Sequence, residues 1–216
     1  METKALIFDL DGVIVDTAKF HFLAWKALAD ELGMSFDEDV NERLKGVSRM
    51  RSFEIILEVN HAEDRFSEEE KQALITKKND LYVEFISRLT PADILPGIGK
   101  LLDRARAEGL KTAVASVSKN APTVLKALGI TDKFDYVADA AKVSRSKPDP
   151  EIFLVCAENL GVSPESCIGI EDSQAGIEAI KSAGMRSVGI NVTVTSVEPD
   201  IVLSSTSELD FDKVVF

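Results

Sequence analysis

Four short apolar runs have the length and continuous hydrophobicity of strands buried in a parallel sheet. Each run is followed by a polar or glycine-bearing loop, and most of these loops lead into a helix-like stretch. Strands that alternate with helices predict an α/β, Rossmann-like core, in which helices cover both faces of a parallel sheet and ligands bind beyond the carboxyl ends of the strands. The predicted strands are residues 4–8, 111–115, 167–170 and 187–190.

Residues 16–90 follow a different pattern, with long amphipathic stretches at 18–32 and 68–89 and no convincing strand. The first stretch has apolar residues at helical spacing, and Gly33 is a typical helix stop. Proline and glycine near position 91 then mark the return to the alternating pattern. We therefore predict a core of residues 1–15 and 91–216, with residues 16–90 as a helical cap inserted after the first strand.

Composition and charge narrow the class of protein. The length of 216 residues and a hydrophobic content of 45% are sufficient for a buried core. We find neither a signal peptide nor a run long enough to span a membrane, so a cytoplasmic protein is expected. Cys156 and Cys167 both fall in apolar patterns, which predicts reduced core thiols. The net charge of -12 argues against nucleic acid or an anionic membrane as a partner, but not against a small anionic substrate.

Asp9 and Asp11 flank one residue at the end of the first predicted strand, in the sequence Asp9-Leu10-Asp11-Gly12-Val13. An extended chain would point both carboxylates to the same side. Such a pair is unfavourable unless a cation or a proton is shared, so one carboxylate could attack while the other transfers a proton. Asp-Gly is also common in solvated turns, and the pentapeptide alone supports both interpretations equally.

Three further loops contain groups that complement this pair. Ser116 follows the second predicted strand, Lys147 precedes a Pro-Asp-Pro sequence, and Glu171-Asp172 follows the third predicted strand. Taken singly, they fit a helix cap, a surface charge and a capped helix start. Together they offer oxygen ligands for Mg2+ and donors for phosphate oxygens, which predicts phosphoryl transfer.

The same residues resemble the signature of the haloacid dehalogenase superfamily, and the resemblance covers essentially the whole chain. Further matches extend it to the hexose-phosphate mutases of that superfamily. The superfamily motifs are Asp9-Leu10-Asp11-Gly12-Val13, Ser116, Lys147 and Glu171-Asp172. The further matches are Asp16-Thr17, His21 with Trp25-Lys26-Ala27-Leu28, Leu44-Lys45-Gly46-Val47-Ser48-Arg49, Ser118-Lys119-Asn120 and Glu171-Asp172-Ser173-Gln174-Ala175-Gly176-Ile177.

This resemblance implies an isomerase that interconverts β-D-glucose 1-phosphate and glucose 6-phosphate through glucose 1,6-bisphosphate, which also acts as the activating phosphodonor. Asp9 would carry the phosphoryl group, and Asp11 would be the general acid and base with His21 assisting. Lys147 and Ser116 would bind the transferred phosphoryl group. Mg2+ would be held by Asp9, the backbone carbonyl of Asp11, Glu171 and Asp172.

A mutase also needs a second site for the phosphate that is not being transferred. The resemblance assigns this site to Arg49, Ser118, Lys119 and Asn120, although Lys119-Asn120 taken alone would be a polar loop before a helix. A guanidinium suits the task because it can meet two phosphate oxygens at once. Val117 departs from the smaller residue expected there, and its backbone N–H would still donate. Substrate contacts are also implied for Thr17, Trp25, Lys45, Gly46 and Val47.

Several alternatives stay open on sequence grounds. A sugar-phosphate phosphatase would keep the core residues without needing Arg49, and a non-catalytic sugar-phosphate sensor would not need Asp11 beside Asp9. Lys77 or Lys78 could also reach the sugar pocket, although two adjacent lysines on a helix ordinarily form a solvated face. A monomer is expected, with connections near 15–17 and 90–91 acting as hinges, and the tail after Ile190 matches no motif.

Overall fold

The computed structural model describes residues 2–44 and 47–215. Within them the strands are β1 (Ala5–Phe8), β2 (Lys111–Val114), β3 (Tyr136–Val137), β4 (Cys167–Glu171), β5 (Arg186–Ile190) and β6 (Ile201–Leu203). They form one parallel sheet in the order β3-β2-β1-β4-β5-β6. The predicted Rossmann-like α/β class is therefore confirmed. The hydrophobic pattern does not predict β3 and β6, because two and three residues are too few to establish a periodicity.

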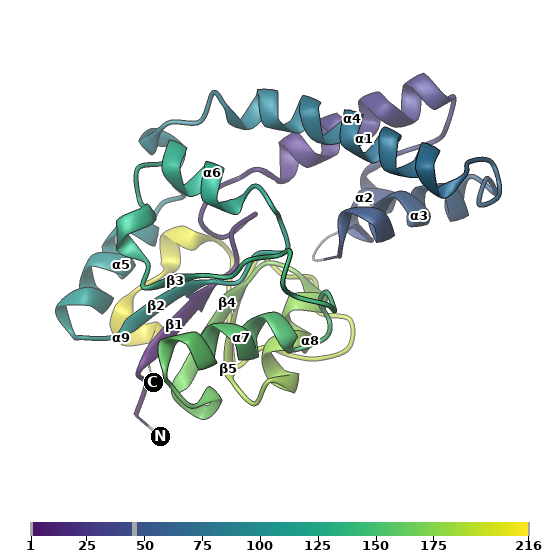
Figure 1. The fold of residues 1–216 in the computed structure, drawn as a ribbon. Helices are drawn as coiled ribbons and strands as arrows, with labels where there is room; N and C mark the ends of the chain where they lie inside the picture. Colours follow the sequence, from purple (N-terminus) through teal and green to yellow (C-terminus); the bar gives the residue numbers. More distant parts are fainter. Residues whose placement is uncertain (1, 45–46, 216) are drawn as a thin grey trace.

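The central strand β1 shows why helices cover both faces of the sheet (Figure 1). Leu6 and Phe8 belong to the apolar cluster on one face, whereas Ala5 and Ile7 belong to the cluster on the other. Successive strand residues point to opposite faces, so a strand covered on both sides is apolar throughout. The first face is covered by α5 (Ile98–Ala107), α6 (Ala121–Ala127) and α9 (Phe211–Val214), and the second by α7 (Glu151–Leu160) and α8 (Gln174–Ser182). Short 3-10 helices in the connections are η1 (Pro91–Asp93), η2 (Thr131–Lys133), η3 (Pro164–Ser166) and η4 (Thr206–Glu208).

Residues 18–86 contain a group of helices that lies apart from the sheet in Figure 1 and is called the helical insertion below. One of them begins and ends at the predicted residues, and Gly33 ends it with a φ of 68° while its N–H donates to the carbonyls of Ala29 and Asp30. Another ends at Ile86, three residues before the predicted position. The described helices of the insertion are α1 (Ala18–Leu32), α2 (Glu38–Glu42), α3 (Arg49–Val59) and α4 (Glu68–Ile86).

The helical insertion has an apolar cluster of its own. Trp25 and Phe53 stack at its centre, with ring centroids 6.1 Å apart and planes 6° from parallel. Ala24, Tyr82 and Ile86, at the base of α1 and α4, instead join the cluster of the sheet. The insertion is therefore packed internally and is also anchored to the core through the base of two helices.

The two chain connections between insertion and core lie side by side. Val15 forms isolated bridges to Asp11 and to Ile94, and the Leu95 N–H donates to the Ile14 carbonyl at 2.9 Å. The entering and leaving segments are thus hydrogen-bonded to each other, and Asp11 is bridged to the entering segment.

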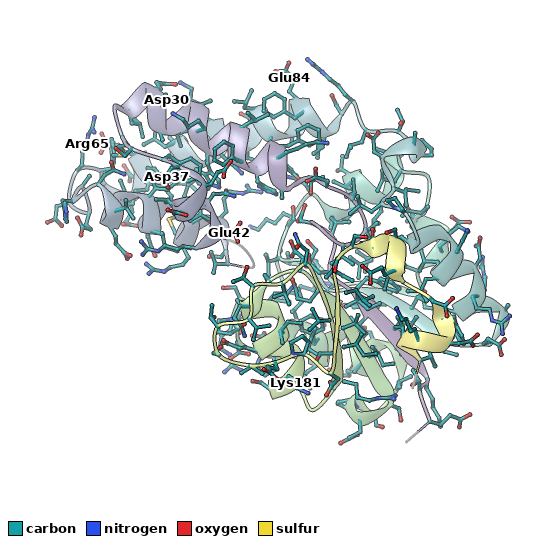
Figure 2. All side chains as sticks on the ribbon, turned by 180° about the vertical axis from the view of Figure 1, so that it is seen from behind. Asp30, Asp37, Glu42, Arg65, Glu84 and Lys181 are labelled. Atoms are coloured by element: carbon teal, nitrogen blue, oxygen red, sulfur yellow. The ribbon has the colours of Figure 1, made fainter. Side chains whose placement is uncertain are left out.

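Cys156 and Cys167 are buried and free, so the prediction of core thiols is confirmed. Among the described helices, none is long and apolar enough to cross a membrane. Charged side chains cover the outside of the helical insertion, as the labels of Asp30, Arg65 and Glu84 in Figure 2 show.

Candidate active site

Polar side chains from separate loops meet at the carboxyl ends of the central strands. Asp9 directly follows β1, Ser116 lies two residues beyond β2, and Glu171 is the last residue of β4. β1 pairs in parallel with both β2 and β4, so these strand ends lie beside one another. The topology of the sheet thus brings together residues that are far apart in sequence.

The buried ammonium of Lys147 lies between two of these carboxylates. Its Nζ is 2.6 Å from Asp9 Oδ1 and 2.7 Å from Glu171 Oε2. Burial alone would lower the pKa of Lys147, but the two carboxylates raise it well above its ordinary value. Burial also raises the pKa of Asp9 to about 7, although Lys147 opposes this rise. Lys147 therefore stays charged and offsets part of the negative charge around Asp9.

Asp9, Glu171 and Asp172 form an acidic cluster suited to a metal ion. One ligand atom from each lies within 4.8 Å of the others. Gly12, with a φ of 85°, makes room for the cluster, since a Cβ at this position would lie 2.2 Å from Asp172 Oδ2. Several buried carboxylate oxygens around one point are the donor set that a hard divalent cation prefers. The described residues therefore fit Mg2+.

The Glu171 side chain is fixed from several directions. Its Oε1 accepts from the backbone N–H of Asp172 at 3.0 Å, and from the N–H and Oγ of Ser173 at 3.1 Å and 2.9 Å. A Cβ on Gly176 would lie 1.9 Å from Glu171 Oε2, so this carboxylate fills the space that a larger residue in α8 would occupy. These contacts place Glu171 before any cation binds.

Asp11 faces the helical insertion rather than Lys147. Thr17 Oγ1 donates a hydrogen bond to Asp11 Oδ1, and His21 Nε2 lies 3.9 Å from the same oxygen. Burial raises the pKa of Asp11 to about 6, while Lys147 and Lys78 lower it. Asp9 and Asp11 therefore share one site but have different partners.

His21 is held in a defined tautomer by Lys78. The Lys78 Nζ lies 2.8 Å from His21 Nδ1, and the His21 ring stacks on Tyr82 with centroids 4.0 Å apart. Burial, Lys78 and Arg49 place the pKa of His21 well below 6.5, so the imidazole is neutral. When Lys78 is charged, its ammonium can only donate, so Nδ1 accepts and the ring proton lies on Nε2, the nitrogen nearer Asp11.

The adjacent lysines of α4 behave differently, and the expectation of a solvated face is wrong for one of them. Lys77 is exposed and pairs with Glu31. Lys78 is buried, with its Nζ 4.7 Å from the Trp25 ring centroid and 5.1 Å from that of Tyr82. Ile75, Lys78, Tyr82 and Ile86 are the buried positions of α4, so Lys78 occupies the apolar stripe. That three- and four-residue spacing is the signal that could have found it.

The loop after β2 is organised by its own side chains. Ser116 Oγ, which is buried, accepts from the Ser118 N–H at 3.1 Å, and Ser118 Oγ accepts from the Asn120 N–H at 3.2 Å. Asn120 Nδ2 donates to Asn79 Oδ1 of α4 at 2.8 Å. The predicted phosphate loop is therefore ordered within the core and also contacts the helical insertion.

A cavity of about 110 Å³ lies between the strand ends and the helical insertion. Five predicted residues do not line it: Thr17, Ser116 and Lys147 are buried, Lys119 is exposed, and Asn120 is half-buried. Lys45 and Gly46 lie outside the described residues. The predicted residues that line the cavity are Asp9, Asp11, His21, Trp25, Val47, Arg49, Val117, Ser118, Glu171 and Asp172. Lys78, one of the two lysines that could reach the pocket, also lines it. Ala18, Asn41, Leu44 and Ser52 line it too and were not among the predicted residues.

Comparison with known proteins places this arrangement in a family. The model of the haloacid dehalogenase-like hydrolases matches residues 3–184. The chain belongs to this family. The superfamily membership that the motifs predict is thereby confirmed.

Relatives within the haloacid dehalogenase-like family include mutases and phosphatases. A β-phosphoglucomutase of Bacillus subtilis (strain 168) is 50% identical over 209 residues, which cover 97% of this chain and 92% of the relative. A phosphorylated carbohydrates phosphatase of Thermotoga maritima is 32% identical over 187 residues, or 86% of this chain and 83% of the relative. The crystal structure of a β-phosphoglucomutase from Clostridium difficile has a TM-score of 0.93 and 48% identity, and the match covers 98% of this chain and 95% of that one.

Proposed function

We propose that this protein is a β-phosphoglucomutase, an isomerase that interconverts β-D-glucose 1-phosphate and glucose 6-phosphate. The observation that carries the proposal is that one cavity joins the Asp9 and Asp11 carboxylates to a second anion-binding group, Arg49 with Ser118. A phosphatase needs the first pair alone, whereas a mutase must also hold the phosphate that stays on the sugar. The similarity to β-phosphoglucomutases over nearly the whole chain supports the same choice.

In the proposed reaction, a carboxylate oxygen of Asp9 bonds to phosphorus while the bond from phosphorus to the sugar oxygen breaks. Asp11 gives its proton to the departing sugar oxygen. In the opposite direction, Asp11 takes the proton from the sugar hydroxyl that attacks the phosphorylated Asp9. Asp9 needs no separate base, because Lys147 favours its ionised form against the rise in pKa that burial causes, and a bound cation would act in the same direction. His21, with its proton on Nε2, would donate a hydrogen bond to an Asp11 oxygen whether that carboxyl group is protonated or ionised.

The residues proposed to hold Mg2+ are Asp9, Glu171 and Asp172, together with the backbone carbonyl of Asp11. When bound, the cation would offset the charge of the phosphoryl oxygens that face the Asp9 carboxylate. Lys147 and Ser116 are proposed to bind the same phosphoryl group. Lys147 is already charged and fixed in place, so it needs no reorganisation during the transfer.

The helical insertion is proposed to act as a cap that selects the sugar and excludes water, with 16–90 as the cap and 1–15 with 91–216 as the core. Exclusion of water would protect the aspartyl phosphate from hydrolysis until a sugar hydroxyl attacks it. That attack would free Asp9 and form glucose 1,6-bisphosphate, also the activating phosphodonor, which would then turn round within the closed site. Sugar contacts are proposed for Thr17, Trp25, Lys45, Gly46 and Val47. The second phosphate site is proposed to comprise Arg49, Val117, Ser118, Lys119 and Asn120. A cytoplasmic monomer completes the proposal.

One assay distinguishes the proposed function from its rivals. The protein is incubated with β-glucose 1-phosphate, Mg2+ and a trace of glucose 1,6-bisphosphate, and glucose 6-phosphate and free phosphate are followed over time. Isomer without phosphate release supports the mutase, phosphate alone supports a phosphatase, and neither product supports a binding protein. Asp9→Asn is expected to abolish turnover, because an amide cannot serve as the nucleophile. Retained turnover in this variant would exclude Asp9 from that role.

A further inference from the structure

A side chain of the helical insertion contacts the loop proposed to bind the second phosphate. Asn79, in α4, accepts a hydrogen bond from Asn120 Nδ2 at 2.8 Å, although the two residues are 41 positions apart. Both side chains are half-buried, and Ser118, which accepts from the Asn120 N–H, lines the cavity. Starting from the proposed function, we propose that Asn79 is a positioning residue that turns the Asn120 amide so that it can donate to the substrate's second phosphate.

The two ends of the Asn120 amide differ in what they can bind. Asn120 has a carbonyl oxygen, which only accepts, and an NH2 group with two donors. Phosphate oxygens only accept, so Asn120 helps to bind phosphate when its NH2 end faces the anion and opposes binding when its oxygen does. The Asn79 oxygen takes one of the two N–H donors. The other N–H diverges from it in the amide plane and stays available to the phosphate.

The backbone around Asn120 does not provide this control. The Asn120 N–H donates to Ser118 Oγ at 3.2 Å, which fixes the main chain of the loop. Rotation about the bonds of the Asn120 side chain leaves that contact unchanged, so a second contact is needed to choose which end of the amide would face a bound phosphate. Asn79 supplies such a contact from a different part of the chain.

The position of Asn79 on α4 makes the contact sensitive to the helical insertion. Lys78, the preceding residue, contacts His21 beside Asp11, whereas Asn79 contacts the phosphate loop. Tyr82, one turn later, has its hydroxyl near Ser118 and Thr17 but completes a hydrogen bond with none of the described residues. One helix of the insertion therefore meets both the proton-transfer side and the phosphate side of the proposed site.

The test uses Asn79→Leu, which keeps the approximate side-chain volume and removes the acceptor. We expect KM for β-glucose 1-phosphate to rise by about 3- to 10-fold, the range of one neutral hydrogen bond, with a smaller change in kcat. Hydrolysis of acetyl phosphate, a donor with no second phosphate, should stay as in the wild type. A control is Asn159→Leu, since Asn159 is exposed on α7 and bonds only its own helix, at the Val155 carbonyl, among the described residues.

A double-mutant cycle with Asn120→Leu decides whether Asn79 acts through Asn120. If it does, the double variant has the KM of Asn120→Leu alone, because no amide remains to be turned. Independent multiplication of the two effects would overturn the inference, as would an unchanged KM in Asn79→Leu. Equal loss of sugar-phosphate and acetyl phosphate turnover would show a merely structural role and would also overturn it. If the wild-type protein forms no isomer, the proposed function itself is wrong. If the wild type is active and Asn79→Leu is unaffected, only the inference about Asn79 is wrong.

Discussion

Two buried lysines serve the same site from opposite sides, and their surroundings move their pKa values in opposite directions. Lys147, on the sheet side, is 2% exposed and donates to the carboxylates of Asp9 and Glu171, which hold its pKa above the ordinary value despite burial. Lys78, on the insertion side, is 3% exposed, and burial lowers its pKa to about 7. A buried ammonium keeps its charge where anions offset its desolvation, and loses it readily where they do not.

The neighbours of Lys78 explain the difference. The groups nearest to it are mostly neutral, Arg49 repels its charge, and Asp11 is the anion that favours it. Its neighbours are His21 and Trp25 from α1, Tyr82 from α4, Arg49 from α3 and Asp11 from the loop after β1. The charge on the sheet side is therefore permanent, whereas the charge on the insertion side depends on a proton that exchanges near neutral pH.

Removal of Lys147 should have the largest effect. Lys147→Met leaves Asp9 and Glu171 buried without their ammonium, and loss of one partner of a buried ion pair destabilises a protein by ~3–5 kcal/mol. Urea unfolding with a chelator present would measure this loss, and turnover should be abolished. Lys181→Met is a suitable control, because Lys181 pairs with Asp200 at a partly exposed site of α8, where such pairs contribute ~0–1 kcal/mol. Equal losses in the two variants would contradict the account of Lys147.

Removal of Lys78 should have the opposite effect on stability. Lys78→Met should stabilise the fold by ~1–4 kcal/mol at pH 6, the range for replacing buried charges by packed apolar groups. In the wild type the folded pKa lies near 7 and the unfolded pKa near 10.5. Below pH 7 both states are protonated and the folded state bears the full penalty. Between these values the unfolded chain binds the proton and the folded chain does not, so wild-type stability rises with pH and the advantage of the variant disappears.

Thermal unfolding from pH 6 to pH 10 would check this second prediction. Lys77→Met is its matched control, since Lys77 is exposed beside Glu31 and should change stability little at any pH. Turnover should fall in Lys78→Met, because His21 Nδ1 loses its donor and the tautomer is no longer fixed. A stability difference that does not depend on pH would contradict the lowered pKa of Lys78.

A smaller effect is expected from Gly176→Ala. The new Cβ would overlap the Glu171 carboxylate and push it from Lys147, and overpacking of this kind destabilises by ~1–3 kcal/mol. The concentration of Mg2+ needed for half-maximal turnover should rise. Gly99→Ala in α5 has open space at its Cβ and should stabilise the helix by ~0.5–1 kcal/mol. Stabilisation in both variants would show that Glu171 can move freely.

The smallest effect is expected from Tyr82→Phe on the insertion side. The Tyr82 hydroxyl is buried and makes no hydrogen bond with the described residues, so its removal should change stability by less than ~1 kcal/mol and in the stabilising direction. Chemical denaturation measures the change. A loss larger than that would reveal a hydrogen bond to Thr17 or Ser118 that forms in solution.

The sequence predicts the sheet side of the site better than the insertion side for a physical reason. Asp9, Ser116 and Glu171 are placed by the ends of parallel strands, and a short apolar run is enough to locate each strand. The short edge strands β3 and β6 cannot be located in this way, because they have too few residues to form a pattern. The fold class and the acidic cluster could therefore be predicted from local sequence.

Residues of the insertion depend on how helices rotate and pack against one another, which local sequence specifies weakly. Lys78 lies on the buried stripe of α4, yet its charge suggests exposure, and the neighbouring Lys77 fits that expectation. Asn79 has no sequence signal at all, because its partner Asn120 belongs to another part of the chain. Ser52 lines the cavity because α3 turns that side chain inward.

The bridges of Val15 to Asp11 and to Ile94 mean that Asp9 and Asp11 are attached to different parts of the fold. Asp9 is fastened to the sheet, since its N–H donates to the Ile170 carbonyl of β4. Asp11, two residues later, is bridged to Val15, which is bridged in turn to Ile94 in the segment that leaves the helical insertion. A rotation of the helical insertion about these bridges would move Asp11 toward or away from a bound sugar oxygen, while Asp9 would keep its place on the sheet. The same bridges would then determine when Asp11 can transfer its proton.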